Sequence, residues 1–300
     1  MDIRYTALRF VFVMARFVPM RPGYFLAECA GNLLFLLSAR YRNIIGNNLQ
    51  RVTGPEQDER TLRQKVRGVF KNVTKNYFDL IKLSQLRLEN LEENVTIEGW
   101  HHLADAVNNS RGVIIATAHL GSFEHAARVL ALRGIKMTIF VEAFDSAPFL
   151  RNIHKLRQGN GSRILPVSVS AMKESMRILR HGGTMIIVCD RDIQGNGVKV
   201  NFCGEETSLP LGAVSLALRT GAAIIPVFSV RKSSDRFAIY IEPPLELVDT
   251  ENRNHSVRVN VEKLAAIMER YIRQYPEQWV ALEPIWRNEA AEINSTQHRR

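Results

Sequence analysis

Short apolar runs alternate with segments of helical periodicity from residue 95 to residue 274. Strands are expected at 95–98, 113–116, 137–141, 164–166, 184–189, 223–230 and 237–241, and helices at 122–133, 148–157, 171–180, 212–220 and 257–274. Upstream, apolar residues at intervals of three and four over 62–83 predict a helix that packs on this body. Continuous apolar strands that alternate with helices are typical of an α/β protein with a mainly parallel central sheet flanked by helices.

The composition agrees with one compact globular unit, because 46% of the 300 residues are hydrophobic and 23% are charged. Cys29, Cys189 and Cys203 are widely spaced, which argues against a disulfide framework and against a CxxC metal site and fits a reducing compartment. Cys189 lies in an apolar run and is expected to pack as a small hydrophobic residue. The net charge of +10 favours an anionic partner, which nucleic acid, acidic phospholipid, coenzyme A or an acidic carrier protein would all satisfy.

The first forty residues are the most apolar part of the chain, in two stretches at 5–19 and 24–39. Charged residues interrupt both stretches, so neither is a signal peptide and neither has an uncharged run that would span a bilayer. Arg9 and Arg16 are seven residues apart and share a helical face opposite an apolar one. We expect residues 1–40 to form interfacial amphipathic helices in the headgroup region, and the alternative is that they cap the core of a soluble protein.

His119 lies three residues beyond the expected strand 113–116, at the sheet edge where α/β proteins bind their ligands. Gly121 permits a tight turn, Ser122 is placed to cap the next helix, and Glu124 falls in the first turn of that helix. An imidazole held by a carboxylate is a suitable general base. A histidine that only caps the turn is the structural alternative.

The sequence offers no motif for an enzyme nucleophile, since it contains no GxSxG and neither Cys189 nor Cys203 has a base such as histidine beside it in sequence. If His119 is catalytic, the attacking oxygen therefore belongs to the substrate. This is the logic of acyl transfer to an alcohol without a covalent enzyme intermediate.

A second polar segment, Asp190-Arg191-Asp192, directly follows the expected strand 184–189 and places three charges on the same edge as His119. Its structural alternative is a solvated loop. Only one histidine is well placed near these acids, so no metal site is expected. His125 and His154 are expected at the surface.

Together these motifs resemble those of the lipid A biosynthesis (lauroyl/myristoyl) acyltransferase family, and most closely its phosphatidylinositol mannoside acyltransferase branch. The resemblance covers most of the chain and rests on His119-x-x-x-x-Glu124, Asp190-Arg191-Asp192, Val200-Asn201-Phe202-Cys203-Gly204, Gly212, Ala217, Thr220-Gly221-Ala222, Ile225-Pro226-Val227, Tyr275-Pro276-Glu277-Gln278-Trp279 and Trp286. It implies a glycerolipid acyltransferase-like fold. Cys203 departs from the family, which usually has a second Phe there.

The resemblance also implies roles for individual residues. His119 would deprotonate the acceptor hydroxyl with support from Glu124, and Asp190 takes the place of an acid, often Glu, that pairs with the histidine in the mannoside branch. Glu142 and Arg157 match by spacing an acid and an arginine that recur in the family.

The implied substrate-binding residues are Glu142, Arg157, Arg191 and Asp192, with the two guanidinium groups meeting a phosphate or the oxyanion of the tetrahedral intermediate. No cofactor is implied, because acyl-CoA or acyl-ACP serves as co-substrate.

The expected protein is thus an O-acyltransferase that moves a fatty acyl chain from acyl-CoA or acyl carrier protein onto a hydroxyl of a membrane glycolipid or lipid A-like acceptor. We expect a monomer, peripheral or monotopic on the cytoplasmic face of the plasma (inner) membrane, with helices in 1–40, the acyltransferase α/β domain in 41–288 and a disordered tail in 289–300. An acyl-thioester hydrolase, or a non-catalytic basic module that binds acidic lipid or nucleic acid, are the alternatives. Nucleic acid is disfavoured because no interleaved stripe of aromatic and basic residues is present.

Overall fold

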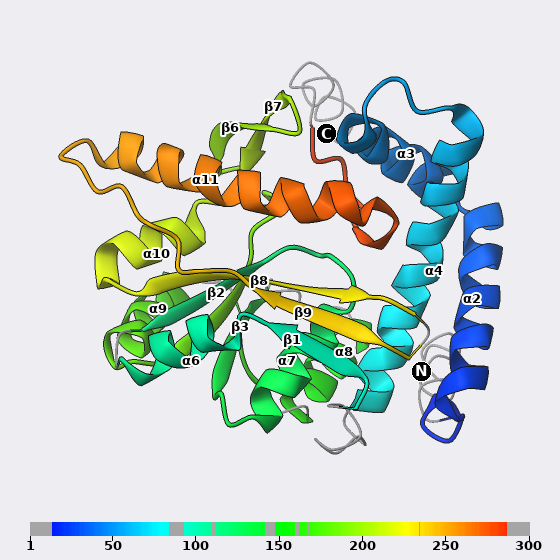
Figure 1. Ribbon diagram of the computed structural model, residues 1–300, viewed down its shortest axis with the longest axis horizontal. Coiled ribbons are helices and arrows are strands. Elements are labelled where there is room, and N and C mark those ends of the chain that lie inside the picture. Colours follow the sequence, from blue (N-terminus) through cyan, green and yellow to red (C-terminus); the bar gives the residue numbers. More distant parts are fainter. Residues whose placement is uncertain are drawn as a thin grey trace.

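The computed structural model describes residues 14–83, 93–109, 112–141, 148–159, 162–166, 169–233 and 235–286. It is an α/β structure in which helices flank a mostly parallel sheet, and a group of amino-terminal helices stands at one end (Figure 1). The fold class predicted from the sequence is therefore confirmed at this level. Residues 1–13 and the expected tail at 289–300 lie outside the described residues.

The central sheet has seven strands in the order β1-β9-β8-β2-β5-β3-β4. In chain order the strands are β1 (Val95–Glu98), β2 (Val113–Thr117), β3 (Met137–Val141), β4 (Ser162–Pro166), β5 (Thr184–Val188), β8 (Ala223–Arg231) and β9 (Phe237–Ile241). Each neighbouring pair is parallel except β8 and β9, which are antiparallel. Because β2 lies between β5 and β8 in the middle of the sheet, all five of its residues are buried.

Helices cover both faces of the sheet, as the alternation along β2 requires. Val113 and Ile115 face α6 (Trp100–Asn108) and α7 (Phe123–Leu132). Ile114 and Ala116 face the core shared with α9 (Val169–Arg180), α10 (Gly212–Thr220) and α11 (Arg253–Gln274). Between β3 and β4 runs α8 (Pro148–Gly159), and the short helix η1 (Pro276–Gln278) follows α11.

A two-stranded hairpin, for which the sequence predicted no strands, consists of β6 (Val198–Phe202) and β7 (Glu205–Leu209). Phe202 is fully buried in it and stacks on Trp286 with ring centroids 5.7 Å apart. Cys203 turns the hairpin with a φ of 57° and is buried. The contacts of this hairpin are with residues far along the chain, which local periodicity does not reveal.

The amino-terminal group consists of α2 (Met20–Leu37), α3 (Ala39–Thr53) and α4 (Glu59–Leu83). In Figure 1, α2 lies against α4 at the edge of the molecule. Gly23 and Gly31 lie at this contact, where an added Cβ would collide with the Phe78 ring and with the backbone of Lys71. The two helices therefore approach closely along one side of α2. None of the helices that the structure describes combines the length and apolar composition needed to cross a bilayer.

Candidate active site

The His119 imidazole and the Asp190 carboxylate meet at the carboxyl-end edge of the sheet. His119 follows β2 and Asp190 follows β5, and these strands pair in parallel with Thr117 opposite Val188. Nδ1 of His119 lies 2.9 Å from Oδ1 of Asp190. The sheet therefore brings together two sequence-predicted site residues that are 71 positions apart.

Asp190 is held rigidly in this position, and its side chain is only 1% exposed. Its Oδ2 accepts hydrogen bonds from the His119 backbone N–H at 3.1 Å and from Trp279 Nε1 at 2.8 Å. Burial alone would raise the pKa of Asp190, but the charge of His119, the hydrogen bonds from His119 and Trp279 and the charge of Arg191 outweigh it and lower the pKa to about 2. The carboxylate is thus ionised at neutral pH.

The ionised carboxylate determines the tautomer of His119. A carboxylate only accepts hydrogen bonds, so the neutral form of the imidazole has its proton on Nδ1 and its lone pair on Nε2. The His119 side chain remains 22% exposed and lines the large cavity described below. Its Nε2 is therefore the ring nitrogen available to a substrate.

The loop that carries His119 is fixed by backbone hydrogen bonds to η1 and to the segment that follows it. Val280 N–H donates to the His119 carbonyl at 2.7 Å, and Gly121 N–H donates to the Gln278 carbonyl at 2.9 Å. Gly121 has a φ of 59°, and a side chain there would collide with the Ser229 carbonyl, so this turn requires glycine.

Glu124 contacts Arg157 rather than the imidazole. Its Oε1 accepts from Arg157 Nε at 2.8 Å and lies 2.7 Å from Arg157 Nη2, and both residues line the cavity. The carboxylate that supports the His119 imidazole is therefore that of Asp190, which accepts the hydrogen bond from Nδ1, and not that of Glu124. The residue next to Glu124, Phe123, packs edge-on against the His119 ring with centroids 5.9 Å apart.

The cavity beside these residues has a volume of about 1020 Å³, above the range of ~300–1,000 Å³ usual for small-molecule pockets. His119, Glu124, Arg157, Arg191 and Asp192 lie in its wall. Apolar side chains make up much of the remaining lining and include Val73, Leu80, Ile115, Phe123, Leu130, Ile139, Phe140, Ile153, Met172, Ile186, Ile187, Leu216 and Val227. The site therefore combines a polar, charged part with an apolar part large enough for a hydrocarbon chain.

The remaining predicted site residues fall in different places. Both carboxylate oxygens of Asp192 accept hydrogen bonds: from Gly195 N–H at 2.9 Å and Gly197 N–H at 2.7 Å in its own loop, and from Ser208 Oγ on β7 at 2.7 Å. Arg191 lines the cavity with Nη1 3.9 Å from a carboxylate oxygen of Glu283. Glu142 lies outside the described residues.

A second buried carboxylate, Asp79 on α4, was not identified from the sequence. Its oxygens accept hydrogen bonds from the Tyr24 hydroxyl at 2.6 Å, from the Ser122 hydroxyl at 2.9 Å and from Arg231. Burial would raise the pKa of Asp79, but the charges of Arg231 and His125 and its hydrogen bonds hold that pKa well below its ordinary value. An acid among the apolar positions of the predicted helix 62–83 was the signal available in the sequence.

Two predictions concern residues around Asp79. Ser122 is the N-cap residue of α7 as predicted, but its hydroxyl donates to Asp79 and makes no side-chain capping hydrogen bond. His125 is not at the surface but 1% exposed, since it lies on the buried side of α7, stacks on Phe237 and contacts Ser122 Oγ at 2.7 Å. These residues form no accessible catalytic triad, because Asp79, Ser122 and His125 are all buried.

Two other expectations concern single side chains. Cys189 is buried as predicted, and burial, then the charge of Asp190, raises the pKa of its thiol to about 12, so it is no nucleophile. His154, expected at the surface, is partly buried and lines the cavity. Among the described residues, no cluster of three His, Cys, Asp or Glu side chains is suited to hold a metal ion.

Comparisons with known proteins agree with the resemblance seen in the motifs. Residues 3–288 match the family described as bacterial lipid A biosynthesis acyltransferase. The phosphatidylinositol mannoside acyltransferase of Mycolicibacterium smegmatis is 26% identical over 249 residues, which cover 78% of this chain and 80% of the relative. That of Mycobacterium tuberculosis is 26% identical over 206 residues, which cover 68% of this chain and 63% of the relative.

Proposed function

Because this chain belongs to the bacterial lipid A biosynthesis acyltransferase family, we propose that it moves a fatty acyl group from a thioester donor, acyl-CoA or acyl-ACP, onto a hydroxyl of a membrane glycolipid. The observation that carries this proposal is the His119–Asp190 pair, whose imidazole borders a cavity of about 1020 Å³. Membership of this family shows that the chain is an acyltransferase. The donor, the acceptor and the roles of individual residues are parts of the proposal.

In this mechanism His119 is the general base. Its Nε2 takes the proton of the acceptor hydroxyl as that oxygen attacks the thioester carbonyl, and Asp190 stabilises the imidazolium that results. The tetrahedral intermediate then collapses, the C–S bond breaks, and the imidazolium returns its proton to the leaving thiolate. No covalent acyl-enzyme forms, which agrees with the burial of Cys189.

Arg157 and Arg191 supply positive charge in the cavity wall. We assign them to phosphate groups of the substrates or to the oxyanion of the intermediate. Glu124 acts through Arg157 as a positioning residue, since its carboxylate binds that guanidinium. A double-mutant cycle of Glu124→Gln and Arg157→Gln should then be strongly non-additive, whereas additive losses would mean that Glu124 acts independently on His119.

The apolar part of the cavity suits the acyl chain. The mycobacterial relatives are phosphatidylinositol mannoside acyltransferases, which favours an acceptor built on phosphatidylinositol mannoside, and the family to which the chain belongs makes a lipid A-like acceptor the second candidate. The remaining proposals are a glycerolipid acyltransferase-like fold and a monomer that is peripheral or monotopic at the cytoplasmic face of the membrane. The amino-terminal helices would lie in the interface, which the exposed leucines of α2 support.

The test is transfer from a radiolabelled acyl donor to purified acceptor lipids, with the products identified by mass spectrometry. Wild-type protein should form an acylated glycolipid, and His119→Ala, which removes the base, should form none above background. Labelled fatty acid released without an acylated lipid would instead identify a thioester hydrolase. An active His119→Ala variant would overturn the mechanism.

A further inference from the structure

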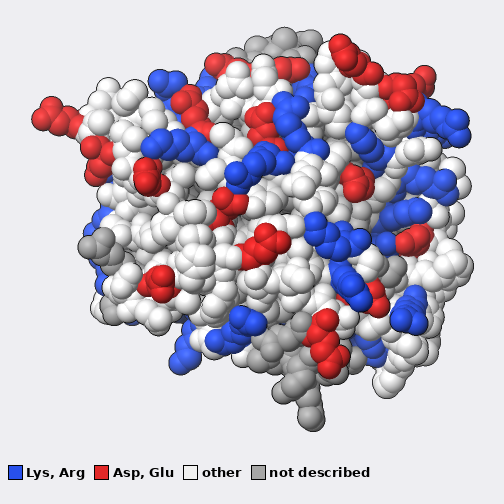
Figure 2. Space-filling model, viewed as in Figure 1, with Lys and Arg blue, Asp and Glu red and all other residues white. Residues whose placement is uncertain are grey.

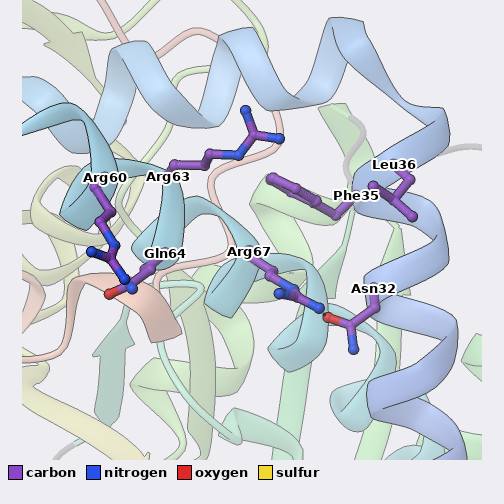
Figure 3. Close-up of a pocket in the computed structure, with 7 residues that line it drawn as sticks. All are labelled: Asn32, Phe35, Leu36, Arg60, Arg63, Gln64 and Arg67. Carbon is purple, nitrogen blue, oxygen red and sulfur yellow. Dashed lines mark hydrogen bonds between the residues drawn. The ribbon is translucent and has the colours of Figure 1, made fainter.

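A small pocket lies between α2 and the beginning of α4, separate from the cavity at His119. It has a volume of about 230 Å³ and is lined by Asn32, Phe35, Leu36, Arg60, Arg63, Gln64 and Arg67. Figure 3 shows its three arginines on one helix and Asn32, Phe35 and Leu36 on the other. We refer to it as the arginine pocket.

The three arginines share one face of α4, because they are spaced by three and four residues. Arg67 Nε donates to Asn32 Oδ1 at 2.7 Å, and the Arg63 guanidinium lies 5.5 Å from the centre of the Phe35 ring. Within the part of the chain that the structure describes, no carboxylate pairs with Arg60, Arg63 or Arg67. Among the described residues, these three guanidinium groups therefore lie on one helix face without a salt bridge.

An exposed apolar surface adjoins the arginine pocket. The outer side of α2 presents large hydrophobic side chains to solvent, at Phe25, Leu26, Leu33, Leu34, Leu36 and Leu37. Leu36 belongs both to this surface and to the pocket lining, and it is 65% exposed. Basic groups and exposed leucines therefore form one continuous surface.

The charge of the chain is concentrated in the same region. Residues 20–71 contain nine Lys or Arg and four Asp or Glu, which is half of the net charge of +10 in about a sixth of the chain. In Figure 2 the basic side chains gather on the right of the molecule, over α2, α3 and α4, beside uncharged atoms at its edge. A partner of this surface must be both anionic and apolar.

We propose that the arginine pocket binds the phosphate of an anionic phospholipid in a bilayer while the leucines of α2 enter the acyl boundary of that leaflet. Guanidinium groups bind phosphate oxygens through paired hydrogen bonds. The pocket is smaller than sites for whole ligands, which start at ~300 Å³, and suits a headgroup whose chains stay in the membrane. This inference deepens the proposed function by naming the surface and the lipid that would hold the enzyme beside its acceptor.

The experiment is co-sedimentation of the full chain with vesicles of phosphatidylcholine and phosphatidylglycerol at 1:1, compared with pure phosphatidylcholine, at constant salt. The test variant is R60Q/R63Q/R67Q. The matched control is R180Q/R219Q/R258Q, which removes the same charge from exposed positions on α9, α10 and α11, away from α2 and α4 (Figure 1). One arginine near an anionic leaflet contributes about fivefold to partitioning, so the test variant should bind roughly 100-fold more weakly and the control less than fivefold.

Equal losses in the two variants would overturn the inference, because the whole positive charge rather than the pocket would then determine binding. Unchanged vesicle binding of the test variant would overturn it too, as would a change only in its sedimentation mass, which would assign the surface to a second copy. Acyl transfer to an acceptor dispersed in detergent needs no vesicle binding, so measuring it tests the proposed function independently of the arginine pocket. The test variant should retain that activity, whereas His119→Ala should lose it and still bind the anionic vesicles.

Discussion

Among the described residues, the buried carboxylates of Asp190 and Asp79 each lie beside a histidine, and the two histidines differ in what the rest of the imidazole ring contacts. Asp190 holds His119, whose side chain is 22% exposed and borders the large cavity. Asp79 lies 3.5 Å from His125, which is 1% exposed and stacked on Phe237. A histidine beside a carboxylate therefore does not define a catalytic site. The two histidines differ in whether the second ring nitrogen can reach a cavity, as it can in His119.

The two carboxylates also differ in their other partners. The Asp190 carboxylate binds the imidazole of His119 and the indole of Trp279, so its negative charge acts on a single base, His119. Asp79 instead joins α2 through Tyr24, the His119 loop through Ser122 and strand β8 through Arg231. The first arrangement suits proton transfer, and the second suits the attachment of the amino-terminal helices to the sheet.

The largest expected effect is that of Asp190→Asn on catalysis. The amide would not stabilise the imidazolium and would permit the wrong tautomer of His119, so kcat should fall by about 10³–10⁴. The measurement is single-turnover acyl transfer under saturating donor and acceptor. A loss below tenfold would mean that the Asp190 charge is not needed by the base.

The next effect is that of Asp79→Asn on stability. This change leaves the Arg231 charge buried without its partner, which should lower the free energy of unfolding by about 3–5 kcal/mol. Urea unfolding measures it. As a matched control, Asp79→Leu combined with Arg231→Met removes both charges and should recover much of the loss. No recovery would mean that the hydrogen bonds of Tyr24 and Ser122, rather than the unpaired charge, dominate.

A smaller effect concerns acid stability. The pKa of Asp190 is lowered to about 2 in the folded protein from 3.8, so its ionisation stabilises the fold above pH ~4, and this contribution disappears as the pH falls from about 4 to 2. The contribution is about 2 kcal/mol for this fully buried group. Between pH 5 and pH 2 the free energy of unfolding should therefore fall by that much more in the wild type than in Asp190→Asn. Parallel pH curves for the two proteins would contradict this.

The sequence predicted those parts of the structure that depend on local pattern. The apolar run 113–116 made β2 recognisable, and the ends of β2 and β5 placed His119 and Asp190 on one edge of the sheet. The partner of Glu124 was not predictable, because it required knowing which side chain would occupy Nδ1 of His119. The Asp79 cluster depends on Arg231, which lies 152 residues away. Such contacts follow from the assembled fold and leave no periodic signal in the chain.

The most direct test of the central claim compares His119→Ala with His125→Ala, each measured for single-turnover acyl transfer per folded molecule and for the free energy of unfolding. His119→Ala should lower the rate about 10³-fold or more, and because it takes a hydrogen bond from the buried Asp190 carboxylate, it should also lower the free energy of unfolding by about 1–3 kcal/mol. His125→Ala should lower the free energy of unfolding by about 2 kcal/mol or more and leave the rate of the folded molecules within about tenfold. The reverse result, with chemistry lost at His125 and kept at His119, would contradict the account.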